Sequence, residues 1–423
     1  MRTILCTLCA CVAFAQAPAR KLTLSEASAM ALRNNPRIAL DALAPAMADA
    51  ATTGIRSALY PAIVAQSSAV AALNDSRLSA GALNNPIIFS RLAFGVSGSY
   101  LLSDFGRTSN LVESAKLRAD SLRQSVQATR SQILFAVHRA FFSALRARKV
   151  KQVSDSTLSA RQLLLDQVAT LSKNGLKSTL DVSFAEVNVS EARLSVLGAQ
   201  NEFDTAIAEL SALLGFPEPQ PFDPVEVDLV SDTPPTVSEL SAEALKGRPE
   251  MAALRIEREA AVRFAMAEDK LSKPTIAALA SAGGAPLHSD RLVNRYAAAG
   301  VTLNLPVFNG HLFDARKLDA RLRVQAVDQR IKEFENVIAR EVAIVAINAD
   351  MAFRRIALTS ELARQSASSV ELAQERYNLG LSSFVELSQA QLNQTTAEIR
   401  NAVARYDYQM LRSAIDFQLG RLR

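Results

Sequence analysis

Side chains that commonly carry catalysis or bind metals are few in this chain and lie far apart. The three histidines fall in a predicted helix, a predicted loop and a predicted helix start, without a second ligand at metal-binding spacing: His138, His288 and His311. All three cysteines precede residue 12. The chain contains no glycine-rich phosphate loop and no nucleophile elbow. We therefore expect no enzymatic activity, no cofactor and no metal site.

Two acidic side chains stand in a motif that the chain contains twice. Asp181 is the third residue after Ser178, and Glu386 is the third residue after Ser383. A serine at the N-cap with an acid three positions later forms a capping box, in which both side chains bond free backbone amides. The acid also stabilises a helix start through the helix dipole. Each motif therefore predicts the beginning of a helix.

The capping motifs belong to a duplication that covers most of the chain. Gly175 and Gly380, which precede the two motifs, are 205 positions apart, whereas nearer the N-terminus the offset is 213, as between Pro36 and Pro249. Further pairs at these offsets are Thr23 with Thr236, Glu26 with Glu239, Ala185 with Ala390, and Gly215 with Gly420. The first copy thus has about eight additional residues between positions 61 and 103. A repeated sequence predicts a repeated structural unit.

Each copy is predicted to begin with a helical stretch that a proline interrupts, followed by two strands. Apolar residues that alternate with small or polar ones predict strands at about 62–72 and 91–102 in the first copy. The second copy has the corresponding patterns at about 275–282 and 295–307, with a turn-rich loop at 283–294. Each copy should therefore contribute one β-hairpin with one apolar face.

A long helical hairpin follows the strands in each copy. Proline-free stretches with apolar residues spaced by three and four predict hairpins at about 104–214 and 309–419, with Asp104 and Asn309 as N-caps. A glycine in the left-handed conformation would end the first helix of each hairpin. The predicted segments are a first repeat at 22–215, a proline-rich linker at 216–235 and a second repeat at 236–420.

The first 15 residues are predicted to be a secretory signal. Arg2 precedes an apolar run, and Ala13-Phe14-Ala15 offers small residues at a cleavage site. Cleavage there would remove every cysteine, which excludes disulfide and thiol chemistry from the mature chain. Leu8-Cys9-Ala10-Cys11 also resembles a loose lipoprotein cleavage box, so lipidation of Cys11 stays open as an alternative.

Composition and charge exclude several classes of protein. The formal net charge is only +5, and its 47 basic and 42 acidic residues are interspersed, so we expect no nucleic-acid partner. Aromatic residues make up 6% and tryptophan is absent, as is typical of long packed helices. Beyond the signal, no stretch approaches the roughly 18–20 apolar residues of a membrane-spanning helix.

A duplicated chain with this order of elements resembles the TolC-like outer-membrane efflux channels, from about Leu22 to Gly420. Each motif that carries the resemblance is weak alone, but their order, spacing and duplication together are specific. These motifs are Leu22-Thr23-Leu24-Ser25-Glu26-Ala27, Asn34-Asn35-Pro36, Arg248-Pro249-Glu250, Pro306-Val307-Phe308-Asn309-Gly310, Arg376-Tyr377-Asn378-Leu379-Gly380-Leu381-Ser382-Ser383 and Ala404-Arg405-Tyr406-Asp407-Tyr408.

The resemblance implies a mainly α-helical fold with a small membrane β part. The chain would form a homotrimer with an α-helical barrel and a twelve-stranded β-barrel, four strands per chain, because lipid tolerates no open sheet edge. It also implies a passive exit duct in the outer membrane, with a long periplasmic tunnel. The partners would be outer-membrane lipid, a periplasmic adaptor and an inner-membrane pump. The cargo would be small molecules, or proteins in type I secretion.

The resemblance further implies a constriction near the helical turns. It would be formed by four residues: Asp181, Tyr377, Glu386 and Gln389, the last standing where the best-known member has a second acid. That member's arginine and threonine fall at Ser382 and Leu180, so its salt-bridge latch is missing here. The alternative is that the two acids only cap their helices.

The turns and two strand tyrosines also receive roles from the resemblance. Grooves at the turns would receive the tips of adaptor hairpins through Gly175, Leu176, Ser178, Gly380, Leu381 and Ser383. The alternative is that the two glycines act only as C-caps. Tyr100 and Tyr296 would be girdle residues at the membrane interface, or alternatively packed strand aromatics.

The main competing function is that of a periplasmic coiled-coil scaffold that never enters a membrane. It accounts for the helices and turns, but not for two hairpins with an apolar face each. Within the channel class, the absence of a histidine- or methionine-rich tract gives no support to metal efflux.

Overall fold

The structure is a computed structural model, and it leaves a few segments undescribed. The described residues are 20–73, 76–77, 87–227, 232, 234–235, 237–287 and 293–422. The predicted signal, Cys11, Thr236 and His288 therefore lie outside the described residues.

Corresponding helices of the two copies have equal lengths, which supports the duplication. The short helices α1 (Leu24–Asn34) and α5 (Val237–Gly247) have 11 residues, and α2 (Pro36–Arg56) and α6 (Pro249–Asp269) have 21. The long helices α3 (Arg107–Lys173) and α7 (Leu312–Asn378) have 67, and the return helices α4 (Thr179–Leu213) and α8 (Phe384–Gln418) have 35. At 1.5 Å per residue, α3 and α7 are each about 100 Å long.

The contacts divide the chain into two compact units, and each unit takes residues from both copies. One unit, here the turn unit, consists of Met1–Ala39, Ala128–Arg248 and Ile338–Arg423. The other, the sheet unit, consists of Leu40–Gln127 and Pro249–Val337. The long helices α3 and α7 contribute to both units.

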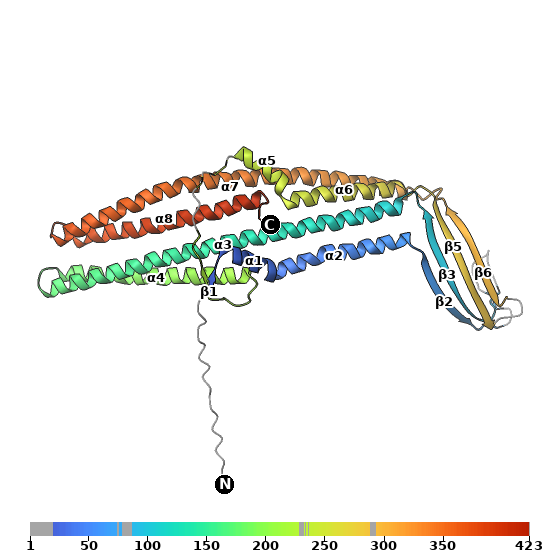
Figure 1. The fold of residues 1–423 in the computed structure, drawn as a ribbon, viewed down its shortest axis with the longest axis horizontal. Helices are drawn as coiled ribbons and strands as arrows, with labels where there is room; N and C mark the ends of the chain where they lie inside the picture. The colour runs from blue at the N-terminus through green and yellow to red at the C-terminus, as the bar shows by residue number, and fades with distance from the viewer. Residues whose placement is uncertain are drawn as a thin grey trace, which may run out of the picture. The chain divides into compact units, whose positions relative to one another are not determined.

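In the turn unit, α4 folds back along α3 and α8 folds back along α7 (Figure 1). One core of this unit joins α1 to α3 and α4, with Phe141, Leu145 and Leu210 fully buried. Gly215 and Gly420 follow the return helices α4 and α8, and their lack of a side chain allows the chain to pass close to the ends of the short helices α1 and α5. A Cβ on Gly215 would meet the carbonyl oxygen of Asn34 at 2.7 Å, and one on Gly420 would overlap the equivalent Gly247 carbonyl.

The segment between the copies is more than a linker. Its β4 (Phe222–Pro224) pairs in parallel with β1 (Arg20–Leu22), and both Phe222 and Leu22 are buried. Neither strand was predicted, because three residues carry no readable periodicity. The predicted linker at 216–235 therefore contributes to the core of the turn unit.

The long helices begin three residues later than predicted. Asp104 accepts hydrogen bonds from the amides of Gly106 (3.1 Å) and Thr108 (2.7 Å), so its carboxylate does cap backbone groups. Helix α3 nevertheless starts at Arg107, after the left-handed pair Phe105-Gly106. The equivalent pair before α7, Gly310-His311, is also left-handed, which places Asn309 outside that helix.

The sheet unit contains one antiparallel sheet in the order β2-β3-β5-β6 (Figure 1). Its strands are β2 (Ala62–Val70), β3 (Arg91–Ser103), β5 (Thr275–Leu287) and β6 (Arg295–Asn304). Strand β5 continues past the predicted end at 282, because Gly283 and Gly284 pair with both neighbours. Strand β6 ends at Asn304, two residues before Pro306, which has no amide hydrogen to donate to a strand ladder.

The two faces of the sheet differ in chemistry. The strand registers place Ile63, Phe94, Val96, Tyr100 and Val301 on one face, which is apolar. The opposite face is mostly small and polar, with Gln66, Ser97, Ser99, Ser281, Thr302 and Asn304, but it also carries Val64 and Leu279. Tyr100 lies on the apolar face, and Tyr296 lies on the opposite one.

A candidate functional site at the helical turns

Both long helices end in the turn that the sequence predicted. Gly175 and Gly380 share a φ of 74°, the left-handed conformation that glycine adopts without steric cost. The next amides, of Leu176 and Leu381, donate back to the carbonyls of Leu171 (2.9 Å) and Arg376 (2.8 Å). These are Schellman motifs, which bond otherwise free carbonyls at the helix ends.

The return helices start at the predicted serines. Ser178 accepts from the amide of Leu180 at 3.1 Å, and Ser383 accepts from the amide of Glu386 at 3.2 Å. At Thr23 the capping box is complete, because the Glu26 carboxylate also accepts from the N-cap amide. Among the described residues, neither Asp181 nor Glu386 forms such a return bond to its N-cap amide. The capping explanation of Asp181 and Glu386 is therefore weaker than the sequence suggested.

Tyr377 is the buried centre of this region. Only 3% of it is exposed, and its ring packs edge-on against Phe384 with centroids 6.0 Å apart. Burial, and secondarily the charge of Asp181, raise the pKa of the Tyr377 hydroxyl. The hydroxyl stays protonated at neutral pH, yet it has no hydrogen-bond partner among the described residues. A buried donor without an acceptor costs free energy that an alternative arrangement could recover.

Lys177 connects the first turn to the second helical hairpin, which the sequence did not predict. Its ammonium lies 3.9 Å from the centroid of the Tyr377 ring and donates to the Tyr377 carbonyl oxygen at 3.3 Å. At the offset of the repeat, Lys177 corresponds to Ser382, whose hydroxyl is buried without a partner. The basic residue of this region therefore stands in the first copy and reaches the second.

The other predicted constriction residues lie on the surface of the same region. Glu386 forms an exposed ion pair with Arg376 at 3.5 Å, which joins the start of α8 to the end of α7. Gln389 is exposed and donates to Asn393 at 3.1 Å on the same helix. Asp181 is half-buried. The structure thus brings Asp181 near enough to Tyr377 for its charge to act on the hydroxyl.

Hydrogen bonds also connect the two hairpins away from the turns. Asn188 on α4 donates to the Ser388 hydroxyl on α8 at 2.8 Å, and Asn188 in turn accepts from the buried Arg161 at 2.9 Å. Further along, the hydroxyls of Thr157 and Thr395 are 3.2 Å apart. Near the turns an apolar cluster also joins the hairpins, with Leu164 and Val168 of the first in one core with Tyr377, Phe384 and Leu387 of the second. The contact between the hairpins is therefore both apolar and polar.

The tips of the turns expose apolar side chains. Leu176 and Leu381 occupy equivalent positions and are 68% and 66% exposed. In many Schellman motifs this position packs against its own helix. Two leucines that remain in solvent at equivalent places form a surface suited to a partner.

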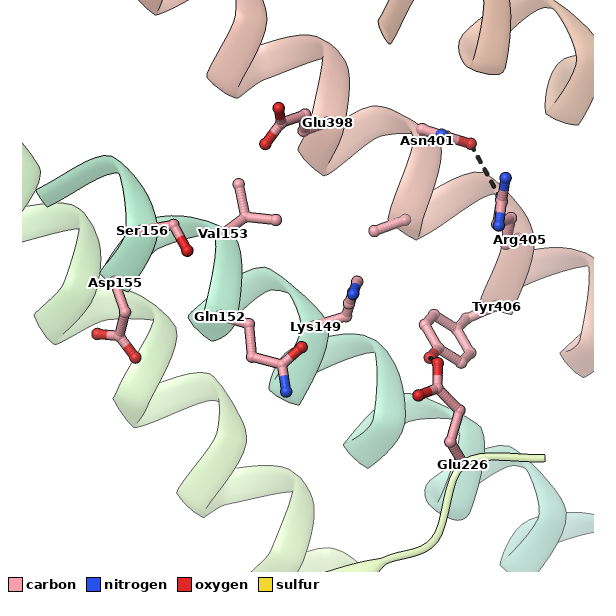
Figure 2. A pocket seen from close by; sticks show the side chains of 11 residues that line it. Lys149, Gln152, Val153, Asp155, Ser156, Glu226, Glu398, Asn401, Arg405 and Tyr406 are labelled. Atoms are coloured by element: carbon pink, nitrogen blue, oxygen red, sulfur yellow. Dashed lines mark hydrogen bonds between the residues drawn. The ribbon is translucent and has the colours of Figure 1, made fainter. Parts of the chain in front are cut away.

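A cavity of about 810 Å³ lies between α3 and α8 in the turn unit (Figure 2). Lys149 and Arg405 line it together with the acids Glu226 and Glu398. Tyr406 donates to Glu226 at 3.2 Å, and its burial, followed by the charge of Glu226, raises the pKa of its hydroxyl to about 12. This bond attaches the segment after β4 to α8 and is kept throughout the physiological pH range.

The remaining predicted features concern histidines and membrane helices. His138 shares a hydrogen bond with Ser28 at 3.3 Å, and burial lowers the pKa of its imidazole. His311 is exposed and lies 3.6 Å from Asp314. Where the chain is described, no helix is both long and apolar enough to span a membrane.

Comparison with known protein sequences places this arrangement among outer-membrane proteins. Residues 27–216 and 240–421 match the family described as outer membrane efflux protein. The toluene efflux pump outer membrane protein TtgC of Pseudomonas putida is 25% identical over 315 residues, which are 72% of this chain and 63% of that protein. The antibiotic efflux pump outer membrane protein ArpC of P. putida is 24% identical over 314 residues, with the same coverage. The chain therefore spans a little less than two thirds of these relatives.

Solved structures share the fold over nearly the whole chain. The outer membrane protein VceC of Vibrio cholerae has a TM-score of 0.80 at 19% identity, covering 94% of this chain and 96% of VceC. CusC has a TM-score of 0.81 at 19% identity, covering 94% and 92%. These likenesses confirm the predicted TolC-like fold. The alternative of a scaffold outside the membrane finds no support among them.

Proposed function

Because the chain belongs to the outer membrane efflux protein family, we propose that it is the passive outer-membrane duct of a tripartite efflux or secretion system. The observation that carries this proposal is the combination of two 67-residue helices ending in paired turns with a four-stranded sheet that has one apolar face. The helices supply the length of a tunnel, and the sheet supplies a wall that lipid can contact.

The sheet supports assembly into a trimer. Its outer strands β2 and β6 each have a neighbour on one side only. An open sheet edge in hydrocarbon leaves backbone amides and carbonyls unpaired, at a cost of several kcal/mol for each group. Three chains joined edge to edge would give a closed barrel of twelve strands with the apolar face outward.

The helices support the same assembly. Two apolar seams with heptad-like spacing are exposed on the chain. The seam on α4 consists of Leu180, Phe184, Val187, Leu194 and Leu197. The seam on α7 consists of Ile344, Ile347, Met351, Leu358 and Leu362. Such seams are typical of helices that pack against other helices. In a trimer, the α4 seam of one chain would pack against the α7 seam of the next.

The constriction of the duct would lie at the turns, with Tyr377 as its buried centre. Lys177 would hold the two hairpins of one chain together in the closed state, replacing the latch that Ser382 and Leu180 cannot form. In the open state the Tyr377 hydroxyl would gain an acceptor, and Asp181, whose charge already acts on the hydroxyl, is the candidate. Glu386 and its ion-pair partner Arg376 would place three carboxylates and three guanidinium groups at the mouth, so that loss of the carboxylates would shift the local charge against cations.

A periplasmic adaptor would dock at the turn tips, which would connect the duct to an inner-membrane pump. Leu176 and Leu381 would be its apolar contacts, while Gly175 and Gly380 permit close approach of a partner backbone. The variant Leu381→Asp should keep its conductance in bilayers but lose efflux in cells. Normal efflux by this variant would exclude Leu381 from the docking surface.

The proposed function is tested by planar-bilayer conductance of the full chain purified in detergent. Discrete conductance steps from a trimer are expected. The scaffold alternative predicts a protein that purifies from the soluble periplasm without detergent and shows no conductance. A detergent-dependent trimer that never conducts, even with the Lys177 contact removed, would also refute the duct.

A further inference from the structure

The row of residues Tyr296, Gly283 and Gly95 crosses three neighbouring strands on one face of the sheet. Gly283 pairs directly with Tyr296 on β6 and with Gly95 on β3. A Cβ at either glycine would overlap the hydroxyl end of Tyr296. The tyrosine ring therefore lies flat along the sheet, in a socket that exists because two successive positions have no side chain.

This socket lies on the small polar face. The strand registers put Tyr296 on the same face as Ser97, Ser281 and Thr302, and opposite to Phe94 and Val96. In a closed membrane barrel the apolar face contacts lipid and the polar face lines the lumen. Given the proposed function, Tyr296 is thus a residue of the barrel lumen, repeated at one level by the three chains.

The neighbours of Tyr296 on this face are too small to confine its ring. Ala298 and Ser281 lie beside it, only Gln66 next to Gly95 is longer, and Tyr296 itself is 45% exposed. An aromatic ring that covers glycines also stabilises a sheet, and that contribution holds in any assembly. The socket has a second effect that depends on the barrel: without it, the ring would have to project away from the wall.

We propose that the Gly95–Gly283 socket holds Tyr296 against the barrel wall and thereby sets the bore of the duct. Three rings lying flat leave the lumen open, whereas three projecting rings would narrow it at a single level. The placement of the Tyr296 ring then controls the bore of the β-barrel, independently of the constriction at the helical turns.

The test uses Gly95→Ala in the full-length trimer, measured as single-channel conductance in planar bilayers. A Cβ at Gly95 would lie 3.1 Å from the Ala282 carbonyl oxygen, a tight contact that a small shift can relieve. Gly283 is less suitable, since a Cβ there would run into the backbone carbonyl of Phe94. We expect Gly95→Ala to lower the conductance, and Gly95→Ala/Tyr296→Ala to restore it to at least the wild-type value.

The matched control is Gly98→Ala, which lies on the same strand and on the apolar face. A Cβ there would meet nothing closer than the Ala62 carbonyl at 3.9 Å. This variant should conduct like the wild type. Unchanged conductance in Gly95→Ala, or a decrease that persists in the double variant, would overturn the proposal. A wild-type trimer that does not conduct would instead refute the duct function itself.

A second variant covers the case in which Gly95→Ala does not assemble. Tyr296→Cys should react with a bulky water-soluble thiol reagent, and the reaction should decrease the conductance. Val301→Cys, on the same strand and the apolar face, should conduct unchanged under the same treatment. Wild-type protein controls for the three natural cysteines. If Tyr296→Cys does not respond to the reagent, its position is not in the lumen and the proposal fails.

Discussion

Replacement of Lys177 by methionine is the most direct test of the contact between the two turns. Methionine keeps an unbranched apolar chain of similar length but removes the ammonium. The variant therefore loses the cation–π contact with the Tyr377 ring, at 3.9 Å, and the hydrogen bond to the Tyr377 carbonyl, at 3.3 Å. The Schellman turn at Gly175 depends on backbone bonds only and should be retained.

The expected magnitude follows from these two interactions. A cation–π contact contributes about 0.5–1 kcal/mol at an exposed site and about 2 kcal/mol when desolvated. The hydrogen bond is long and Lys177 is only half-buried, so it adds about 0.5 kcal/mol, the lower limit for such bonds. A loss of about 1–2 kcal/mol per chain changes a two-state equilibrium about 5- to 30-fold.

The assay is the open probability of single trimers in planar bilayers, compared with wild type at the same voltage. Lys177→Met should raise the open probability by the stated factor or more, because three chains contribute. Lys173→Met is the matched control, since it removes the same charge from the last turn of α3, at an exposed position. Equal effects of the two variants would mean that the contact with Tyr377 does not hold the turns together.

A double-mutant cycle separates the contact from other effects of the substitution. Tyr377→Leu removes the ring but keeps an apolar side chain in the cluster with Phe384 and Leu387. If Lys177 acts through the ring, its effect in the Tyr377→Leu background should shrink to that of the backbone hydrogen bond. Full additivity of the two variants would refute the reasoning.

Three further predictions concern charges. Glu386→Gln keeps a polar residue at the start of α8, so trimers should form normally, but the reversal potential in a salt gradient should show weaker cation preference; an unchanged potential would remove Glu386 from the mouth of the duct. Glu268→Ala deletes a carboxylate that is 2% exposed and accepts two hydrogen bonds from Arg316, at 2.6 and 2.9 Å. The variant should lower the free energy of unfolding by about 1–3 kcal/mol and no more, since Arg316 can still reach water. Asp319→Ala, which breaks an exposed ion pair, should lower it far less. Burial lowers the pKa of His138 in the folded chain, so the unfolded chain binds more protons than the folded one as the pH falls through about 6.5. The free energy of unfolding should therefore decrease below that pH, with a slope of at most about 1.4 kcal/mol per pH unit. His138→Gln should remove this component of the pH dependence.

The features that could be predicted from the sequence are those with short-range causes. Gly175 and Gly380 end their helices because a left-handed residue is needed there, and that requirement can be read from a single glycine after a long periodic stretch. Ser178 and Ser383 were identified as N-caps for the same reason. Because the chain is duplicated, the same glycine and serine signals occur at two equivalent positions, and each occurrence supports the other.

The features that could not be predicted depend on distant residues or on very short segments. Lys177 and Tyr377 are 200 positions apart, and nothing near Lys177 indicates an aromatic partner. The pairing of β1 with β4 joins segments of three residues. The face of Tyr296, in contrast, was available from the alternation in its own strand, because even-numbered positions also carry Gly300, Thr302 and Asn304.

One equivalent position of the two long helices carries charges of opposite sign in the sheet unit. Two similar short helices, α2 and α6, must each select one of two similar long helices. On α3, Arg123 pairs with Asp49 of α2 at 2.6 Å. On α7 the equivalent position, 205 residues later, is Asp328, and it pairs with Arg258 of α6 at 2.5 Å. The long helices therefore carry opposite charges at this position, whereas the short-helix partners are one turn apart: the residue equivalent to Asp49 is Val262, four positions after Arg258.

This reversal predicts an asymmetric response to mutation. An exposed ion pair contributes little by itself, so Arg123→Ala should barely change the thermal stability of the trimer. Arg123→Asp should reduce the yield of folded trimer, because it opposes Asp49 and gives α3 the charge that α7 carries at this position. Arg123→Asp/Asp49→Arg restores an attractive pair within the first copy but makes it identical in sign to the second. If the charges specify pairing, this double variant should recover stability but not the full yield of correctly folded trimer; complete recovery of both would show that the pairing is determined elsewhere.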